Sequence, residues 1–173
     1  MKYNVAQLLK EAIGSHRNFD IEEDICDAEH PMEHVRGAVD MVRTHQGIWV
    51  QARLVVRVPQ YCSRCLDAFS RTIRIELDEE YFPEVDVKTG MSALPPDEWD
   101  ALCIAADQNL DLAEATRQAT LAAMPLKPLC KPECVGICDR CGCDRNQGPC
   151  DCYNREIDPR WAALRSLMDE QQL

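Results

Sequence analysis

Eleven cysteines in 173 residues, seven of them within residues 130–152, limit the fold of this chain more than any other feature. That segment, CKPECVGICDRCGCDRNQGPCDC, is rich in proline and glycine and has too few apolar side chains to pack a core of its own. A chain of this length can bury a hydrophobic core without covalent staples. The cysteines therefore indicate metal binding or thiol chemistry rather than a disulfide framework.

The spacing of the cysteines indicates how they are used. Two cysteines separated by two residues can direct both sulfurs to one ion, and structural zinc commonly takes four thiolates in a tetrahedron. Four close pairs therefore allow two zinc sites, and Cys26, Cys103 and Cys143 are left over. The pairs are Cys62 with Cys65, Cys130 with Cys134, Cys138 with Cys141, and Cys150 with Cys152.

The third and fourth pairs are close enough in sequence to form one site by themselves. The first two pairs are then predicted to meet in a second site. Two alternatives stay open: Cys143 replaces a member of the fourth pair, or the first pair is a free dithiol. Cys26 and Cys103 are expected to be buried small residues or surface bystanders.

Alternating apolar residues predict a half-buried antiparallel sheet. In IWVQARLVVRV, at residues 48–58, every second side chain faces inward, and the preceding THQG is a plausible turn from a strand at residues 35–43. A further strand is predicted at residues 69–77, and residues 17–25 could form another. The CSRC pair then lies in the loop between the strands at 48–58 and 69–77.

Helices are predicted on either side of these strands in the sequence. NVAQLLKEAIG indicates a short helix near the start, and residues 98–105 indicate another within an acidic loop. Asp111 and Glu114 have the spacing of a capping box before LAEATRQATLAAM, which places Leu112 and several alanines on one side. DPRWAALRSLMDEQQ predicts a closing helix with Asp158 as its N-cap.

These patterns together predict the fold class. We expect an α+β protein: an antiparallel β-sheet of about three to five strands, with packed helices and a C-terminal cysteine-rich zinc-binding segment. The predicted domains are an α+β domain at residues 1–126 and a metal-binding segment with its closing helix at residues 127–173.

The charge of the chain is unevenly distributed. The net charge is −11, but residues 35–75 hold seven arginines against two aspartates, whereas residues 76–114 hold twelve acidic residues against one lysine. The negative total opposes generic binding to nucleic acid. A planar guanidinium nevertheless suits phosphate, so outward arginines are candidate RNA contacts, with a merely solvated face as the alternative. The candidates are Arg36, Arg53, Arg57, Arg64 and Arg74.

Several motifs, taken in order, resemble the large ribosomal RNA subunit accumulation (YceD) family. They are CSRCL, a helix ending in LAAMPLKPLC, CVGICDRCGCDRNQGPCDC and DPRWAAL, all between residues 50 and 167. The family motif around the second C-x-x-C reads approximately C-x-G-L-C-P-x-C-G-x-x-L-N. Here Ile137, Asp139 and Arg145 replace its Leu, Pro and final Leu, and Cys143 is an additional cysteine.

The resemblance implies a cytoplasmic protein of bacteria or organelles that is needed for normal levels of 23S ribosomal RNA. Its expected partners are ribosomal RNA or large-subunit assembly intermediates, with a ribosomal protein as a further candidate. The resemblance also implies metal ligation by Cys62, Cys65 and the C-terminal cysteines.

We expect no catalysis, because four thiolates around each zinc leave no position open for water. The four histidines lie far from the cysteine cluster in sequence. The alternatives are a zinc-stabilised protein–protein adaptor and a thiol redox protein. No stretch approaches the roughly 20 apolar residues of a membrane span, so a cytoplasmic protein without a membrane partner is expected.

Overall fold

The computed structural model describes residues 1–25, 32–93, 102–153 and 160. The chain divides into two compact units. The sheet unit combines Met1–Gln60 with Ala68–Pro128, and the cysteine unit combines Tyr61–Asp67 with the chain from Leu129 onward. The loop that carries Cys62 and Cys65 therefore groups with the cysteine-rich segment.

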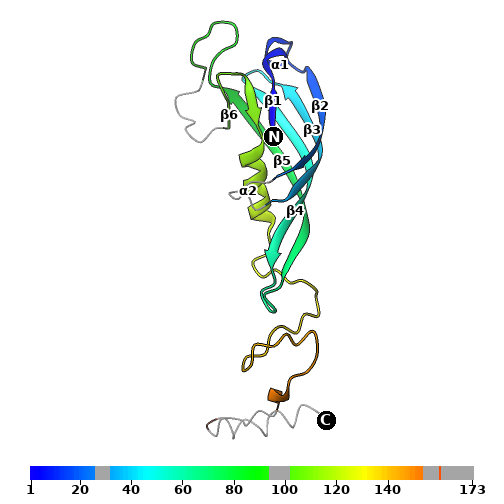
Figure 1. The fold of residues 1–173 in the computed structure, drawn as a ribbon. Coiled ribbons are helices and arrows are strands. Elements are labelled where there is room, and N and C mark those ends of the chain that lie inside the picture. Colours follow the sequence, from blue (N-terminus) through cyan, green and yellow to red (C-terminus); the bar gives the residue numbers. More distant parts are fainter. Residues whose placement is uncertain (26–31, 94–101, 154–159, 161–173) are drawn as a thin grey trace. The chain divides into compact units, whose positions relative to one another are not determined.

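Within the described residues, seven strands form one sheet in the order β1-β7-β6-β5-β4-β3-β2 (Figure 1). The sheet is mixed and not purely antiparallel, because β6 runs parallel to β5. The purely antiparallel prediction was wrong because β6 has only two residues, too few for an alternating pattern, and is reached by a long crossover from β5. The strands are β1 (Lys2–Asn4), β2 (His16–Asp24), β3 (His34–Arg43), β4 (Ile48–Tyr61), β5 (Ala68–Pro83), β6 (Cys103–Ile104) and β7 (Asn109–Asp111).

The predicted alternation is confirmed in the long central strands. Along β4, every second residue from Ile48 to Val58 is buried, and the intervening side chains face outward. The antiparallel register places Val39 of β3 opposite Ala52 and Met41 opposite Val50, so the two strands share one buried face. β-Branched side chains suit such a half-buried surface.

The predicted turn between β3 and β4 is also present. The Thr44 backbone N–H donates to the Gly47 carbonyl at 3.0 Å, and the Gly47 N–H donates to Thr44 Oγ1 at 2.8 Å. A Cβ at Gly47 would lie 2.0 Å from the Tyr81 carbonyl oxygen of β5. Glycine is required here because the turn passes directly against the neighbouring strand.

The two edge strands of the sheet, β1 and β2, approach each other through their side chains. The rings of Tyr3 and Phe19 are 5.0 Å apart, and the amino group of Met1 lies 3.6 Å from Glu23 Oε2. The sheet is therefore strongly curved (Figure 1). Contact between the edges leaves less unpaired strand open to other chains.

Two α-helices occur among the described residues, so helix packing is more limited than predicted. α1 (Ala6–Lys10) is a single short turn that buries Leu8 and Leu9. α2 (Ala113–Ala123) contacts β5 and buries Ala115, Thr116 and Thr120.

α2 begins one residue later than the predicted capping box, with Leu112 at its N-cap position. Asp111 Oδ1 accepts a hydrogen bond from the Ala113 N–H at 2.9 Å, and the Glu114 carboxylate binds Arg117 and Gln118. Of the predicted apolar side of this helix, Ala123 is exposed.

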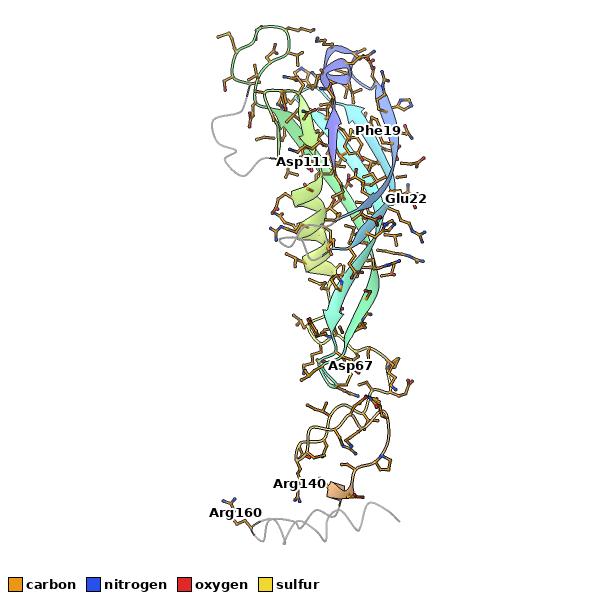
Figure 2. The ribbon with its side chains drawn as sticks, viewed as in Figure 1. Phe19, Glu22, Asp67, Asp111, Arg140 and Arg160 are labelled. Atoms are coloured by element: carbon orange, nitrogen blue, oxygen red, sulfur yellow. The ribbon has the colours of Figure 1, made fainter. Side chains whose placement is uncertain are left out.

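Two predicted helices lie wholly or partly outside the described residues. Of the helix predicted at residues 98–105, residues 103 and 104 form β6 instead, and residues 98–101 are not described. The closing helix from Asp158 also lies outside, apart from Arg160 (Figure 2). Among described residues, no helix has the length and apolar character to cross a membrane.

Candidate metal centres

The first tetrad consists of Cys62, Cys65, Cys130 and Cys134, whose sulfur atoms all lie within 4.8 Å of one another. Cys62 Sγ is 3.7 Å from Cys134 Sγ, and Cys65 Sγ is 3.6 Å from Cys130 Sγ. A zinc–sulfur bond of about 2.3 Å implies tetrahedral sulfur–sulfur edges of about 3.8 Å, whereas a disulfide requires about 2.05 Å. The spacing therefore fits four thiolates around one metal ion.

A tight turn presents the first pair of thiols. The Leu66 N–H donates to the Cys62 carbonyl and the Cys62 N–H donates to the Asp67 carbonyl, both at 2.9 Å. Leu66 adopts φ 64°, in the left-handed region. This closed turn lets both sulfurs point to one side, as the C-x-x-C spacing predicts.

Arg64 joins this turn to the segment that carries the second pair. Its guanidinium donates to the Cys134 carbonyl at 2.7 Å, and its own carbonyl accepts the Ile137 N–H at 3.1 Å. Gly136 makes this approach possible: it has φ +84°, and a Cβ there would lie 2.9 Å from the Arg64 carbonyl oxygen. Arg64, predicted as an RNA contact, thus has a structural role within the cysteine unit.

Asn146 supports the first tetrad although it was not predicted as a site residue. Its Nδ2 lies 3.4 Å from Cys134 Sγ and 2.7 Å from Asp144 Oδ1, and its Oδ1 accepts the Val135 N–H at 3.0 Å. Such partners orient a metal ligand and satisfy its lone pairs. The signal for this role was present, because Asn146 is the closing asparagine of the C-x-G-L-C motif.

The second tetrad consists of Cys138, Cys141, Cys150 and Cys152, also with all sulfurs within 4.8 Å of one another. Its first half is a compact knuckle. The Arg140 N–H donates to Cys138 Sγ at 3.5 Å, and the Gly142 N–H donates to the Cys138 carbonyl at 3.0 Å. The structure thus brings together both of the predicted groups of four.

Cys143 is a fifth thiol beside the second tetrad. Its sulfur lies 3.3 Å from Cys141 Sγ, and its carbonyl accepts the Cys138 N–H at 2.8 Å. The Cys141 side chain raises the pKa of the Cys143 thiol. A dication bound to Cys141 would offset this effect.

Backbone amides favour the thiolate form at Cys62 of the first tetrad and at Cys138 and Cys141 of the second. The Cys65 N–H, helped by the amides of Cys130 and Arg64, lowers the pKa of Cys62 to about 6 despite its burial. The Cys143 N–H likewise lowers the pKa of Cys141 to about 6. Conversely, the Cys141 side chain raises the pKa of Cys152 to about 11. Thiols this close compete for negative charge, which a bound dication would relieve.

Four sulfur donors in a tetrahedral arrangement suit zinc or an iron–sulfur cluster. They leave no vacant coordination position of the kind that catalytic zinc uses for water. The described histidines are His16, His34 and His45, and all three belong to the sheet unit. Within the described part of the chain, the tetrads are therefore pure thiol sites.

Residues 50–168 match the family model described as large ribosomal RNA subunit accumulation protein YceD. The chain belongs to the YceD family. The match begins within β4 and includes all eight cysteines of the two tetrads, whereas β1, β2 and β3 precede it. Both candidate metal centres thus lie in the part of the chain that defines family membership.

Curated relatives extend this result. Uncharacterized proteins of Mycobacterium tuberculosis and Mycobacterium bovis are each 28% identical over 123 residues, covering 71% of this chain and 56% of the relative. The chloroplastic YCED homolog 1 of Arabidopsis thaliana, a large ribosomal RNA subunit accumulation protein, is 26% identical over 65 residues, covering 38% and 20%. The chain thus spans about half the length of the mycobacterial relatives. No solved structure matches.

In this YceD-family chain, four of the five predicted RNA-binding arginines lie on the outward face of the sheet. Arg36, Arg53 and Arg57 are exposed on β3 and β4. Gln51 of β4 donates to Asp78 of β5 at 3.3 Å, which shows that the even-numbered side chains of β5 share this face. Arg74 is exposed on the same side of β5.

Acidic groups lie among these arginines. Glu22 of β2, labelled in Figure 2, is directly opposite Arg36 in the register. His34, opposite Arg57, binds Asp24 at 2.7 Å from Nδ1 to Oδ1. The outward face is therefore mixed in charge: positive along β4, with both Arg36 and Asp40 on β3, and acidic along β2 and part of β5.

Proposed function

We propose that this chain is a non-enzymatic ribosome-biogenesis factor that supports accumulation of 23S ribosomal RNA, and that each tetrad holds a structural zinc ion. The proposal rests chiefly on membership of the YceD family, whose description refers to large ribosomal RNA subunit accumulation. Because the chain spans only part of its mycobacterial relatives, the assembly step and the partners are part of the proposal.

The zinc assignment follows from the donor set. Each tetrad offers four thiols at the spacing of a zinc tetrahedron, with amides aimed at sulfur in both turns. Tetrahedral zinc with four cysteines is structural, because every coordination position is filled by protein. This supports an architectural role and gives no support to a zinc hydrolase.

The partner is proposed to be ribosomal RNA or a large-subunit assembly intermediate in the cytoplasm. Arg53 and Arg57 are the best-placed contacts, since they are exposed on a central strand. Arginine can donate two parallel hydrogen bonds to one phosphate. The acidic edge strand β2 suits a basic ribosomal protein as an additional partner.

A protein–protein adaptor is the second candidate, favoured by apolar side chains exposed on the cysteine unit. Leu66 is 62% exposed, Val135 52% and Ile137 39%. Exposed apolar residues on one small unit are typical of interaction sites. An adaptor would reach the ribosomal precursor through a protein instead of through RNA.

The first test is sedimentation of native lysate on a sucrose gradient, with the chain and 23S RNA detected in each fraction. Comigration with large-subunit precursors is expected. Arg53→Glu with Arg57→Glu should shift the chain to the top, whereas Lys88→Glu with Lys127→Glu, at exposed positions of the same unit, should not. Full retention of the arginine variant would exclude the sheet face as the RNA site, and a wild-type chain found wholly at the top would overturn stable association.

A further inference from the structure

The second tetrad has a neighbour that the first tetrad lacks. Cys143 Sγ lies 3.3 Å from Cys141 Sγ, closer than the 3.6 and 3.7 Å contacts within the first tetrad. The remaining described cysteine, Cys103, belongs to β6 of the sheet unit. Only the second tetrad therefore has a spare thiol in contact with a ligand thiol among the described residues.

The positions of these two sulfurs permit a bond between them. A disulfide needs about 2.05 Å between sulfurs and Cα atoms about 4.4–6.8 Å apart, and two residues of chain span at most about 7 Å. The intervening Gly142 has φ +71° and nothing within 4 Å of a Cβ position, so this turn has room to adjust. Closing the gap requires each sulfur to move by roughly 0.6 Å.

Exposure also differs between the two tetrads. Three cysteines of the first tetrad, Cys62, Cys65 and Cys134, are buried, with exposed fractions of 0%, 5% and 0%, and Cys130 is exposed. In the second tetrad only Cys138 is buried, and Cys141 is exposed beside the partly exposed Cys143. A small oxidant therefore reaches the second cluster more readily, and thiol oxidation follows exposure.

We propose that Cys143 is a peroxide-responsive thiol that forms a disulfide with Cys141 and thereby opens the second tetrad, while the first tetrad keeps its metal. The proposal rests on zinc occupancy of the tetrads as proposed above. It makes Cys143, which a four-thiolate metal centre does not need as a ligand, a site of oxidation.

The chemistry balances with hydrogen peroxide as the oxidant. Peroxide converts the Cys143 thiol to a sulfenic acid and is reduced to water. The Cys141 sulfur then attacks the sulfenic sulfur, forms the S–S bond and expels hydroxide, which takes up a proton to give a second water. Cys141 thereby loses its negative charge and its place as a metal ligand, leaving three thiolates. A dithiol reductant reverses the bond and restores the fourth ligand.

The test uses the full zinc-loaded chain, hydrogen peroxide and a chromophoric zinc indicator. One of the two zinc ions should be released, and release should be at least about tenfold slower in Cys143→Ser and Cys143→Ala. Both variants should still contain two zinc ions before oxidation. Cys103→Ser is the matched control and should release zinc as the wild type does.

Mass spectrometry identifies the bond. After free thiols are alkylated, the wild-type peptide with Cys141 and Cys143 should carry no alkyl group on either cysteine, and its mass should be two hydrogens below that of the reduced, unalkylated peptide. Treatment with dithiothreitol before alkylation should remove this difference. Release at the wild-type rate from both Cys143 variants, a disulfide between other cysteines, or only one zinc in the unoxidised variants would each overturn the proposal. A wild-type chain that binds no zinc would overturn it too, whereas the sedimentation test reads the ribosomal role independently.

Discussion

The sheet unit buries apolar side chains from nearly all of its strands, including Leu54, Ile75 and Tyr81, whereas the described residues of the cysteine unit bury only cysteine side chains. Among its described residues, the buried side chains are those of Cys62, Cys65, Cys134 and Cys138. Burial of apolar surface stabilises the first unit. The described part of the second shows no such core, so metal at the proposed zinc sites would have to stabilise it. The zinc proposal thus gives the chain two sources of stability.

Removal of metal should produce the largest difference between the two units. Structural zinc is worth about 10 kcal/mol or more in small peptides, so a strong chelator should unfold the cysteine unit and leave the sheet folded. Amide NMR spectra should lose dispersion for residues 61–67 and 129–153, and keep it for β3, β4 and β5. Loss of the sheet signals at the same chelator concentration would contradict the division.

A cavity in the hydrophobic core should have the opposite effect. Leu54 is 1% exposed, and Leu54→Ala should lower the free energy of unfolding of the sheet unit by about 2–5 kcal/mol. Val55→Ala, at an outward and half-buried position, is the control and should cost about 1 kcal/mol or less. Urea unfolding followed by circular dichroism measures both, and zinc content should not change. A loss of zinc in Leu54→Ala would show that the units are not independent.

Within the cysteine unit, a substitution at Asn146 should lower the metal affinity of the first tetrad and leave that of the second unchanged. Asn146→Ala removes the amide at Cys134 Sγ and leaves the Val135 N–H without its acceptor. Loss of such a supporting contact typically lowers metal affinity about 10- to 100-fold, here at the first tetrad. Competition with a chromophoric chelator measures this affinity, and Gln147→Ala, at an exposed neighbour, provides the control. Equal weakening of both zinc ions would argue against a role specific to Cys134.

Two glycines give the smallest and sharpest contrast. Gly136 and Gly142 have similar φ angles of +84° and +71°, where alanine costs roughly 1–2 kcal/mol. Only at Gly136 would the new Cβ also meet the Arg64 carbonyl. Gly136→Ala should therefore weaken zinc binding at the first tetrad more than Gly142→Ala does at the second. The same competition assay ranks them, and a larger effect of Gly142→Ala would show that the contact with Arg64 is not limiting.

Much of this organisation could be predicted from the sequence because it depends on local patterns. Alternation in residues 48–58 predicted the buried face of β4, and cysteine spacing predicted which four thiols meet in each tetrad. Their occupancy by zinc stays a prediction. Such patterns predict structure well where side chains that share one environment recur at a fixed interval along the chain.

The remaining features depend on partners distant in sequence. β1, β6 and β7 have two or three residues each, so no periodicity marks them, and their pairing is fixed only in the folded sheet. Arg64, in the loop between Cys62 and Cys65, was predicted as an RNA contact, and its bond to the Cys134 carbonyl could not be foreseen because the two residues are 70 positions apart. The mixed charge of the arginine face likewise follows from the register between β2 and β3, which the sequence alone does not reveal.

The first tetrad also has a consequence for the order of folding. Cys65 and Cys130 are 65 positions apart, whereas Cys141 and Cys150 of the second tetrad are separated by 9 positions. With about 0.6 kcal/mol of closure entropy for each doubling of loop length, the longer loop is disfavoured by roughly 2 kcal/mol in an unfolded chain. The second tetrad can therefore take up metal early, from a nearly unstructured chain. Formation of β5 and α2 between the two halves of the first tetrad would remove most of this cost, so the first tetrad is expected to take up metal after the second.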